Sequence, residues 1–273
     1  NICMDPYRFY ETRTQKLQES IREADFDAFL TFDPVNIRYL SGFSGSSAVL
    51  FFTEKERLFC TDFRYKTQAE STIRNYDIHI YPEQMNYLAE TIGKFDSVRK
   101  IGIESDKLSI SSFEDLEKKV LSKVLVPSKS MVENLRLIKD ELEIHHLREA
   151  IRFLEEVLPT LKKKVEPGMR ELDLAIEAEY LLRKAGADGT AFDFIVASGT
   201  RGSMPHGIAS PKKIEEGEMV TLDWGAKYSG YHSDNTRTFG VGSLNDWQKE
   251  IFSLVLEANE KAIKAVRPGI TTK

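Results

Sequence analysis

Two aspartates, Asp223 and Asp234, are the residues whose type and spacing best suit chemistry. They lie eleven positions apart in the stretch EGEMVTLDWGAKYSGYHSDNTRTFGVG, residues 216–242. Carboxylates held close together repel each other, and divalent cations offset that repulsion. A pair of divalent metals about 3.5–4 Å apart is a common device for hydrolysis. The spacing therefore permits a metal-dependent hydrolytic site, and a hairpin with two exposed aspartates is the alternative interpretation.

Two short strands joined by a tight turn are expected to bring these aspartates together. Residues 219–225 alternate apolar and polar side chains, which is the period of a half-buried strand. Residues 233–239 are expected to form the second strand, and Tyr-Ser-Gly at 228–230 supplies the turn. Because eleven is an odd number, a two- or four-residue loop places Asp223 and Asp234 on one face, opposite each other or one diagonal step apart.

This stretch also resembles a known family. VTLDWGAKYSGYHSDNTRTFGVG is similar to the metal-binding hairpin of the Xaa-Pro peptidases, the prolidase and aminopeptidase P group with the pita-bread fold. ASGTRGSMPHGIAS, residues 197–210, resembles the segment that precedes that hairpin in the family. The resemblance implies that Asp223 and Asp234 hold metal ions. We further expect the Thr236 hydroxyl to hold the Asp234 carboxylate in place by a hydrogen bond.

Histidines near the hairpin carry different expectations. The resemblance implies that His206 lies beside the metals, contacts the substrate and assists proton transfer, a role that suits an imidazole titrating near neutral pH. An ordinary loop residue is the alternative for His206. His232 alternates onto the strand face of Asp234, so a ligand role is geometrically open, but the family does not use this position. The adjacent His145 and His146 point about 100° apart on a helix and are expected to be solvated.

Composition excludes several classes of function. The 273 residues carry a net charge of −5, with 41% hydrophobic and 30% charged residues. This balance suits a globular protein and argues against a nucleic-acid partner or an anionic-membrane partner. No apolar run approaches the length of a membrane span, and the first residues lack a signal-peptide core. Cys3 and Cys60 lack metal-ligand spacing, so we expect reduced thiols and a cytoplasmic location.

The first half of the chain predicts an α/β domain over residues 4–127. The expected strands are 26–32, 47–53, 56–62, 77–81 and 100–103, and the expected helices are 8–24, 85–95 and 111–124, the last capped by Ser111 or Ser112. DPVNIRYLSGFSGSSAVLFF resembles the N-terminal domain of creatinase and the Xaa-Pro peptidases. The resemblance implies a domain that shapes the mouth of the active site and contributes to a homodimer.

The break VPSKS at 126–130 predicts the domain boundary, with a second domain over residues 132–273. Its expected elements are a helix over 140–165 kinked or interrupted by Pro159, a helix over 171–185, a strand over 191–197 and a final helix capped by Asn245 or Asp246. This domain resembles the first part of an α+β pita-bread domain. The family's dinuclear site uses two aspartates, one histidine and two glutamates, and no residue of this chain matches the last three. The domain is therefore expected to be incomplete, to expose surface and to have little activity alone.

The resemblance implies metal-dependent hydrolysis of the Xaa-Pro bond at the N-terminus of dipeptides or short peptides. Two ions of Mn, Co or Zn would activate the attacking water, and the partner would be a proline-containing peptide. Two alternatives remain: a non-catalytic pita-bread relative that binds protein or peptide, and a metal-free creatinase-type amidinohydrolase. The aspartate pair disfavours both, and tight stoichiometric metal binding by the intact protein would separate the first interpretation from them.

Overall fold

The computed structural model describes residues 4–271, so Cys3 lies outside the described residues. The chain forms two compact units, the first ending at Ile144 and the second beginning at His145. The boundary expected at 126–130 is wrong, because residues 124–128 form a strand of the first unit's sheet. Val132, just beyond, is fully buried in the core of that unit. The first unit therefore extends through residues 126–130, which the sequence suggested as the linker between domains.

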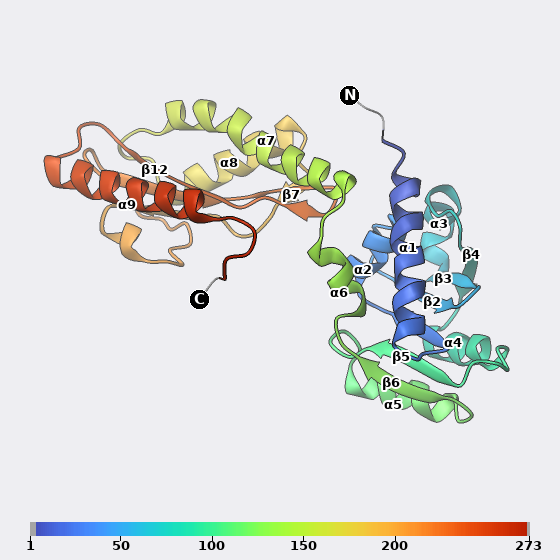
Figure 1. The fold of residues 1–273 in the computed structure, drawn as a ribbon. Coiled ribbons are helices and arrows are strands. Elements are labelled where there is room, and N and C mark those ends of the chain that lie inside the picture. Colours follow the sequence, from blue (N-terminus) through green and yellow to red (C-terminus); the bar gives the residue numbers. More distant parts are fainter. Residues whose placement is uncertain (1–3, 272–273) are drawn as a thin grey trace. The chain divides into compact units, whose positions relative to one another are not determined.

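The first unit is built on one six-stranded sheet in the order β4-β3-β2-β1-β5-β6 (Figure 1). β2 is antiparallel to both of its neighbours, whereas β1, β5 and β6 are parallel to one another and β3 is parallel to β4. The strands are β1 (Ala28–Thr31), β2 (Ala48–Thr53), β3 (Arg57–Asp62), β4 (Asp77–Tyr81), β5 (Lys100–Glu104) and β6 (Val124–Ser128). Parallel strands joined by helices confirm the expected α/β class.

Helices pack against the sheet of the first unit through two cores. They are α1 (Pro6–Glu23), α2 (Pro34–Ser41), η1 (Phe63–Tyr65), α3 (Lys66–Thr72), α4 (Gln84–Gly93), α5 (Ile110–Lys119) and α6 (Met131–Leu137). Successive residues of β1 alternate between the cores: Phe29 packs with α1 and α2, while Ala28 and Leu30 pack with α4 and α5. The sequence interpretation missed α2 and α3, and the cap of α5 is Ser109 rather than Ser111 or Ser112.

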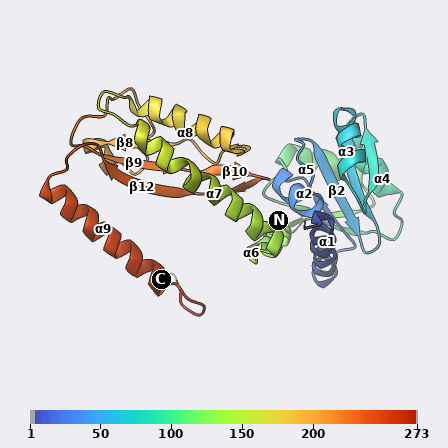
Figure 2. The same cartoon turned by 90° about the horizontal axis from the view of Figure 1, so that it is seen from above.

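The second unit consists of helices and two three-stranded sheets (Figure 2). The sheets have the orders β12-β9-β8 and β11-β10-β7. The elements are α7 (Glu141–Lys164), α8 (Glu171–Ala185), β7 (Gly189–Thr190), β8 (Ile195–Ser198), η2 (Gly199–Ser203), β9 (Met219–Trp224), β10 (Ala226–Tyr228), β11 (Tyr231–His232), β12 (Asn235–Gly240) and α9 (Asp246–Ala265). α7 begins four residues before the division between the units.

Pro159 lies inside α7 without ending it, so of the two expected effects, a kink or an interruption, the interruption does not occur. Its ring lies on the exposed side of the helix, where water can bond the carbonyl that loses its partner. On the other side, Phe153, Val157 and Leu161 are buried in the core of the second unit. Burial of this apolar stripe keeps both halves of α7 against the core.

The core of the second unit lies between one face of β9 and the helices α7 and α8. Val220, Leu222 and Trp224 are fully buried there, packed with Leu174 and Leu182 of α8. The intervening residues of β9, Thr221 and Asp223, belong to the opposite face. The alternation expected over 219–225 is confirmed, and it directs Asp223 away from the helices.

Apolar side chains of α9 are exposed. The helix begins as expected after Asn245, whose side chain accepts the N–H of Gln248 at 2.9 Å. Trp247, Ile251 and Leu254 are 69%, 38% and 54% exposed. The second unit therefore exposes surface, as expected, and the structure places apolar side chains of α9 on it.

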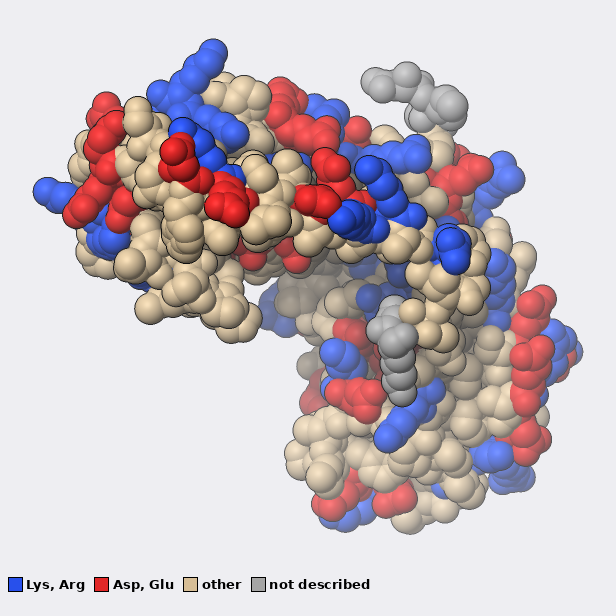
Figure 3. All heavy atoms as spheres, turned by 60° about the vertical axis from the view of Figure 1, so that its left-hand side comes forward, with Lys and Arg blue, Asp and Glu red and all other residues tan. Residues whose placement is uncertain are grey.

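Charged side chains of both signs are interspersed over the face shown in Figure 3, and no single-sign field covers it. This distribution agrees with the net charge of −5. Across residues 4–271, no helix combines the length and the apolar character that crossing a membrane requires.

Leu174→Ala is expected to lower the free energy of unfolding by about 2–5 kcal/mol, since it leaves a cavity among fully buried side chains. Ile176→Ala, on the same helix but 59% exposed, serves as the matched control and should change it by less than about 0.5 kcal/mol. Chemical denaturation of both variants measures the difference. Equal losses would show that α8 does not bury the face described.

Candidate functional site

The two aspartates lie on a long, bent β-hairpin. β9 pairs with β12 antiparallel, with Asp223 opposite Thr236, and β10 pairs with β11, with Tyr228 opposite Tyr231. Both pairings follow one register, closed by a two-residue turn at Ser229 and Gly230 with φ of 49° and 81°. Positive φ at both positions is what a type I′ hairpin turn needs. The expected turn and the two-residue loop are therefore confirmed.

This register places Asp234 just before β12, one diagonal step from Asp223 on the same face. The expected strand over 233–239 is shorter at its start, because the hairpin bends between β10–β11 and β9–β12. The arrangement is therefore the diagonal one of the two that the odd spacing allowed.

Ser233 holds the bend. Its hydroxyl accepts the N–H of Ala226 at 3.0 Å and lies 3.0 Å from the carbonyl of Ala150 in α7, to which it donates. Gly225 lies directly beside it: an added Cβ would overlap the Ser233 carbonyl oxygen and lie 2.8 Å from the Ala191 Cβ. The backbones therefore meet at a position where no side chain fits, immediately beside the aspartate pair.

The two carboxyl groups interact electrostatically. The pKa of Asp234 is raised by partial burial first, then by the negative charge of Asp223 and a hydrogen bond with it. Asp234 is exposed and Asp223 is half-buried, so a cation can approach the pair from solvent. A raised carboxyl pKa beside another carboxylate is the signature of two negative charges held together without full compensation.

Thr236 bonds to the other aspartate than the one expected. Its hydroxyl donates to Oδ1 of Asp223 at 2.8 Å, so the expectation that it holds Asp234 is wrong. The reason is the register, which sets Thr236 directly opposite Asp223 and two residues along the strand from Asp234. The hydrogen bond restrains the Asp223 carboxylate on the face that carries both aspartates.

His206 lies in an exposed loop that the sheet ties down nearby. Ile208, two residues later, forms a β-bridge with Ile195, and Ile195 lies directly opposite Asp223 on the neighbouring strand β8. The backbone two residues after His206 therefore lies beside β8, at the residue that pairs with Asp223. Within residues 4–271, no hydrogen bond joins the His206 imidazole to either aspartate, so the structure brings together Asp223, Asp234 and Thr236 but not His206.

The pairings and ring contacts given for two other histidines, His232 and His146, are with residues other than the aspartates. His232 pairs with Lys227 across the hairpin, on the far side of the bend. Partial burial, then the Lys227 charge, lowers the pKa of His232. His146 packs its ring against Tyr228 and Tyr231, with centroids 5.7 and 5.3 Å apart, so it is not the solvated residue that was expected.

The donor chemistry of the pair fits part of a divalent-metal site. Carboxylate oxygens are ligands that Mn²⁺, Co²⁺ and Zn²⁺ accept in proteins. In the described part of the chain, no cluster of three or more His, Cys, Asp or Glu side chains could hold a metal. Asp223 and Asp234 could therefore supply two ligands of such a site, and its further coordination would have to come from water or other groups.

Glu171, the first residue of α8, is a polar centre that the sequence interpretation missed. Its carboxylate is fully buried and accepts hydrogen bonds from Ser198, Ser210 and Arg201. Residues 198–210 carry His206, so this carboxylate contacts the loop that carries it. Helix periodicity suggested only that residue 171 starts a helix, and only its proximity in space to the loop shows the connection.

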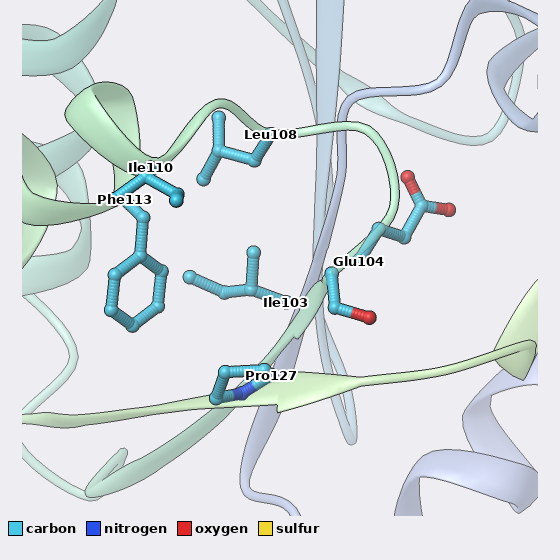
Figure 4. A pocket seen from close by; sticks show the side chains of 7 residues that line it. Ile103, Glu104, Leu108, Ile110, Phe113 and Pro127 are labelled. Atoms are coloured by element: carbon cyan, nitrogen blue, oxygen red, sulfur yellow. The ribbon is translucent and has the colours of Figure 1, made fainter.

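The first unit also has a pocket, shown in Figure 4, but it lacks catalytic groups. Its volume is about 170 Å³, and apolar side chains line most of it: Ile103, Leu108, Ile110, Phe113 and Pro127. The carboxylate of Glu104 points away from this apolar space and already accepts the N–H groups of Phe32 and Asp33 and the amide of Asn36. This pocket therefore offers shape without an available reactive group.

Comparisons with known proteins identify the family. Residues 145–273 match the description "Metallopeptidase family M24", and residues 13–138 match "Creatinase/Prolidase N-terminal domain". The Xaa-Pro dipeptidase of Pyrococcus horikoshii is 34% identical over 263 residues, which cover 96% of this chain and 73% of that protein. The chain belongs to metallopeptidase family M24.

Solved structures agree with this assignment. The M24 chain superposes on an Xaa-Pro dipeptidase from Bacillus anthracis with a TM-score of 0.91 and 36% identity, covering 96% of this chain and 74% of that one. For an X-Pro aminopeptidase from Thermotoga maritima the TM-score is 0.87 and the identity 34%, with coverage of 93% and 73%. The protein is thus a peptidase of the Xaa-Pro peptidase group, with a creatinase-type first unit and a pita-bread second unit.

Gly225→Ala is expected to destabilise this M24 peptidase and to weaken its binding of Mn²⁺, because the Cβ would push the Ser233 backbone away and displace Asp234. Gly202→Ala is the matched control, since its nearest neighbour would be the Thr221 hydroxyl at 3.8 Å. Thermal unfolding and calorimetric Mn²⁺ titration measure both effects. Tolerance of Gly225→Ala would contradict the close backbone approach.

Asp234→Asn is expected to raise the melting temperature in the presence of a chelator at pH 7 by about 1–3 °C, since it removes the repulsion of a largely exposed pair. Because the folded pKa of Asp234 is raised, its protonated form stabilises the fold at low pH. That contribution is lost as pH rises from the ordinary carboxyl range through the raised pKa. Melting curves from pH 4 to 7 measure it.

The exposed Asp193 provides the control Asp193→Asn, which makes the same chemical change outside the pair and should leave the melting temperature at pH 7 unchanged. A metal-free Asp234→Asn protein that melts below the unmodified protein at pH 7 would show that the two carboxylates do not repel.

Proposed function

We propose that this M24 peptidase hydrolyses the Xaa-Pro bond at the N-terminus of dipeptides or short peptides. Two divalent ions of Mn, Co or Zn would be held in part by Asp223 and Asp234. The observation that carries the proposal is the pairing of these carboxylates on one face of a hairpin whose register and turn fix their separation. Family membership and the Xaa-Pro activities in the names of the relatives support the substrate class.

The side chains have distinct roles in this proposal. Asp223 and Asp234 bind the ions, and Thr236 keeps the Asp223 carboxylate in one orientation by its 2.8 Å hydrogen bond. When bound, the ions would supply Lewis acidity and a nucleophilic water at neutral pH. His206 donates a hydrogen bond to the substrate carbonyl and to the negative charge that develops on it. The scissile bond is a tertiary amide without an N–H, so the peptidase must recognise the proline ring by shape.

Two ligands alone leave most coordination positions to water, so the 273 residues by themselves are expected to bind metal weakly and to hydrolyse little peptide. The chain spans about three quarters of the length of the relatives it matches, which are 73% and 74% covered in the two cases compared. We propose the activity for the complete protein.

We also propose a homodimer in the cytoplasm. The dimer follows from the role that the first unit's resemblance implies. The cytoplasm is suggested by the sparse cysteine usage, with Cys60 a free, buried thiol in the first unit. Sedimentation of the whole protein tests the dimer, and fractionation of the source cells tests the location.

The decisive measurement is proline release from an Xaa-Pro dipeptide in the presence of Mn²⁺. Release is expected, and Asp223→Asn or Asp234→Asn should lower kcat by at least about a hundredfold. His206→Ala should lower kcat by about 10–100-fold, since it removes one group that stabilises the transition state. Circular dichroism of each variant checks that the fold is retained.

Different outcomes favour different functions. Hydrolysis of an Xaa-Pro-Pro tripeptide without dipeptide cleavage would indicate an aminopeptidase. No hydrolysis of either peptide, together with no stoichiometric Mn²⁺ binding, would reject the proposal and favour a non-catalytic peptide-binding relative.

A further inference from the structure

The loop that carries His206, residues 198–210, is fixed at both ends by one buried carboxylate. At its start, the N–H and hydroxyl of Ser198 donate to Glu171 at 2.8 and 2.9 Å. At its end, the hydroxyl of Ser210 donates to Glu171 at 2.6 Å and its N–H at 3.3 Å. The Glu171 side chain thereby accepts hydrogen bonds from both ends of the loop and holds these ends together.

Arg201 adds a third attachment inside the loop. Its guanidinium pairs with the Glu171 carboxylate and also donates to the carbonyl of Ile208 at 2.9 Å. The planar fork of an arginine can reach both acceptors at once, which a lysine ammonium on a flexible stem does poorly. Because Ile208 follows His206 by two residues, Arg201 transmits the position of Glu171 to the backbone beside the imidazole.

A second ion pair, between Lys212 and Glu218, also contacts the start of this loop. Lys212 donates to the hydroxyl of Ser198 at 2.9 Å and to Glu218 at 2.7 Å. Gly199 has a φ of +57°, and a Cβ there would overlap the Glu218 carboxylate. The first residues of the loop are therefore held between two carboxylates, with little room to shift.

The position of Glu171 suggests a role in the site. A fully buried carboxylate is costly unless paired and hydrogen-bonded, and an apolar residue often stabilises a fold equally well at such a position. All the hydrogen-bond partners of Glu171 described above belong to the loop of His206. Near the end of this loop, Ile208 forms a β-bridge with Ile195, which lies opposite Asp223 on the neighbouring strand. The hydrogen bonds of Glu171 thus connect the N-terminus of α8, through this loop, to the strand that pairs with β9 opposite Asp223.

We propose that Glu171 is a positioning residue for hydrolysis, acting through Arg201 and the Ile208 carbonyl to hold His206 beside the substrate. This inference rests on the function proposed above for His206. Glu171 itself touches neither substrate nor metal. A shift of about 1 Å in a group that stabilises a transition state can lower a rate by about a hundredfold, so loss of the anchor should be visible in kcat.

The test compares Glu171→Gln with Glu177→Gln in the protein expressed from its whole reading frame. Glu177 lies on the same helix and pairs with Lys164 at 2.6 Å on the surface, so its variant makes the same chemical change outside the network. Glu171→Gln is expected to lower kcat for an Xaa-Pro dipeptide about 10–100-fold with KM within about threefold. Glu177→Gln should leave both constants unchanged.

Combining each variant with His206→Ala separates positioning from general damage. A positioning role predicts that Glu171→Gln lowers kcat less than about twofold further in a protein that already lacks the imidazole. The same fold-loss with and without His206 would overturn the proposal. Mn²⁺ binding should be unchanged by Glu171→Gln, since the pairing of β9 with β12 holds the two aspartates together and the Glu171 side chain bonds to neither of these strands.

Amide hydrogen exchange gives a reading that does not depend on activity. Exchange at residues 204–208 should accelerate in Glu171→Gln and stay unchanged in Glu177→Gln. Unchanged exchange in Glu171→Gln would overturn the anchoring. If Glu171→Gln does not fold, Arg201→Lys replaces it, because lysine keeps the charge and loses the bond to Ile208. If His206→Ala keeps full kcat, the proposed role of His206 fails, and exchange alone decides whether Glu171 anchors the loop.

Discussion

The carboxylates of Asp223 and Asp234 lie on one face of the hairpin, where partial burial and then the negative charge of Asp223 raise the pKa of Asp234, and the core of the second unit fixes the strand that carries Asp223. One face of β9 supplies the stabilising force, because Val220, Leu222 and Trp224 are buried against α7 and α8. The other face of the same strand carries the aspartate. Burial of apolar surface on one side of β9 thus stabilises an arrangement on the other side in which two carboxylates lie close together.

The sequence was sufficient for the features that depend on local periodicity. Alternation of apolar residues predicted β9, and the Tyr-Ser-Gly turn with an odd separation predicted that the aspartates share a face. It was insufficient where two registers or two backbones must be compared. Thr236 was assigned to the wrong aspartate because strand alternation says which face a hydroxyl takes but not which carboxylate lies across from it. The crowding at Gly225 depends on Ser233, Ala191 and Phe192, which no local pattern connects.

The domain boundary predicted from the sequence was wrong for a related reason. The run VPSKS has the composition of a linker, yet its first residues form β6, because the neighbouring strand β5 offers a parallel edge and an apolar core. Proline is likewise a residue type that breaks helices. At Pro159, burial of the apolar side chains on the opposite side of α7 outweighs the one backbone hydrogen bond that is lost. Glu171 was invisible as a site residue because its hydrogen-bond partners lie 27 to 39 residues away along the chain. In each case a tertiary contact overrides or supplies what the local sequence omits.

The continuous register through the bend has a consequence for how this hairpin can change in evolution. Side chains on a strand alternate faces, so a single-residue insertion or deletion between Asp223 and Asp234 would turn one carboxylate to the far side of the sheet. Only changes in steps of two, or one compensated by a bulge, preserve the pair. The number of residues between Asp223 and Asp234, a segment with the Ser229–Gly230 turn in its middle, is therefore constrained in its parity, even where the identity of its residues is free to vary.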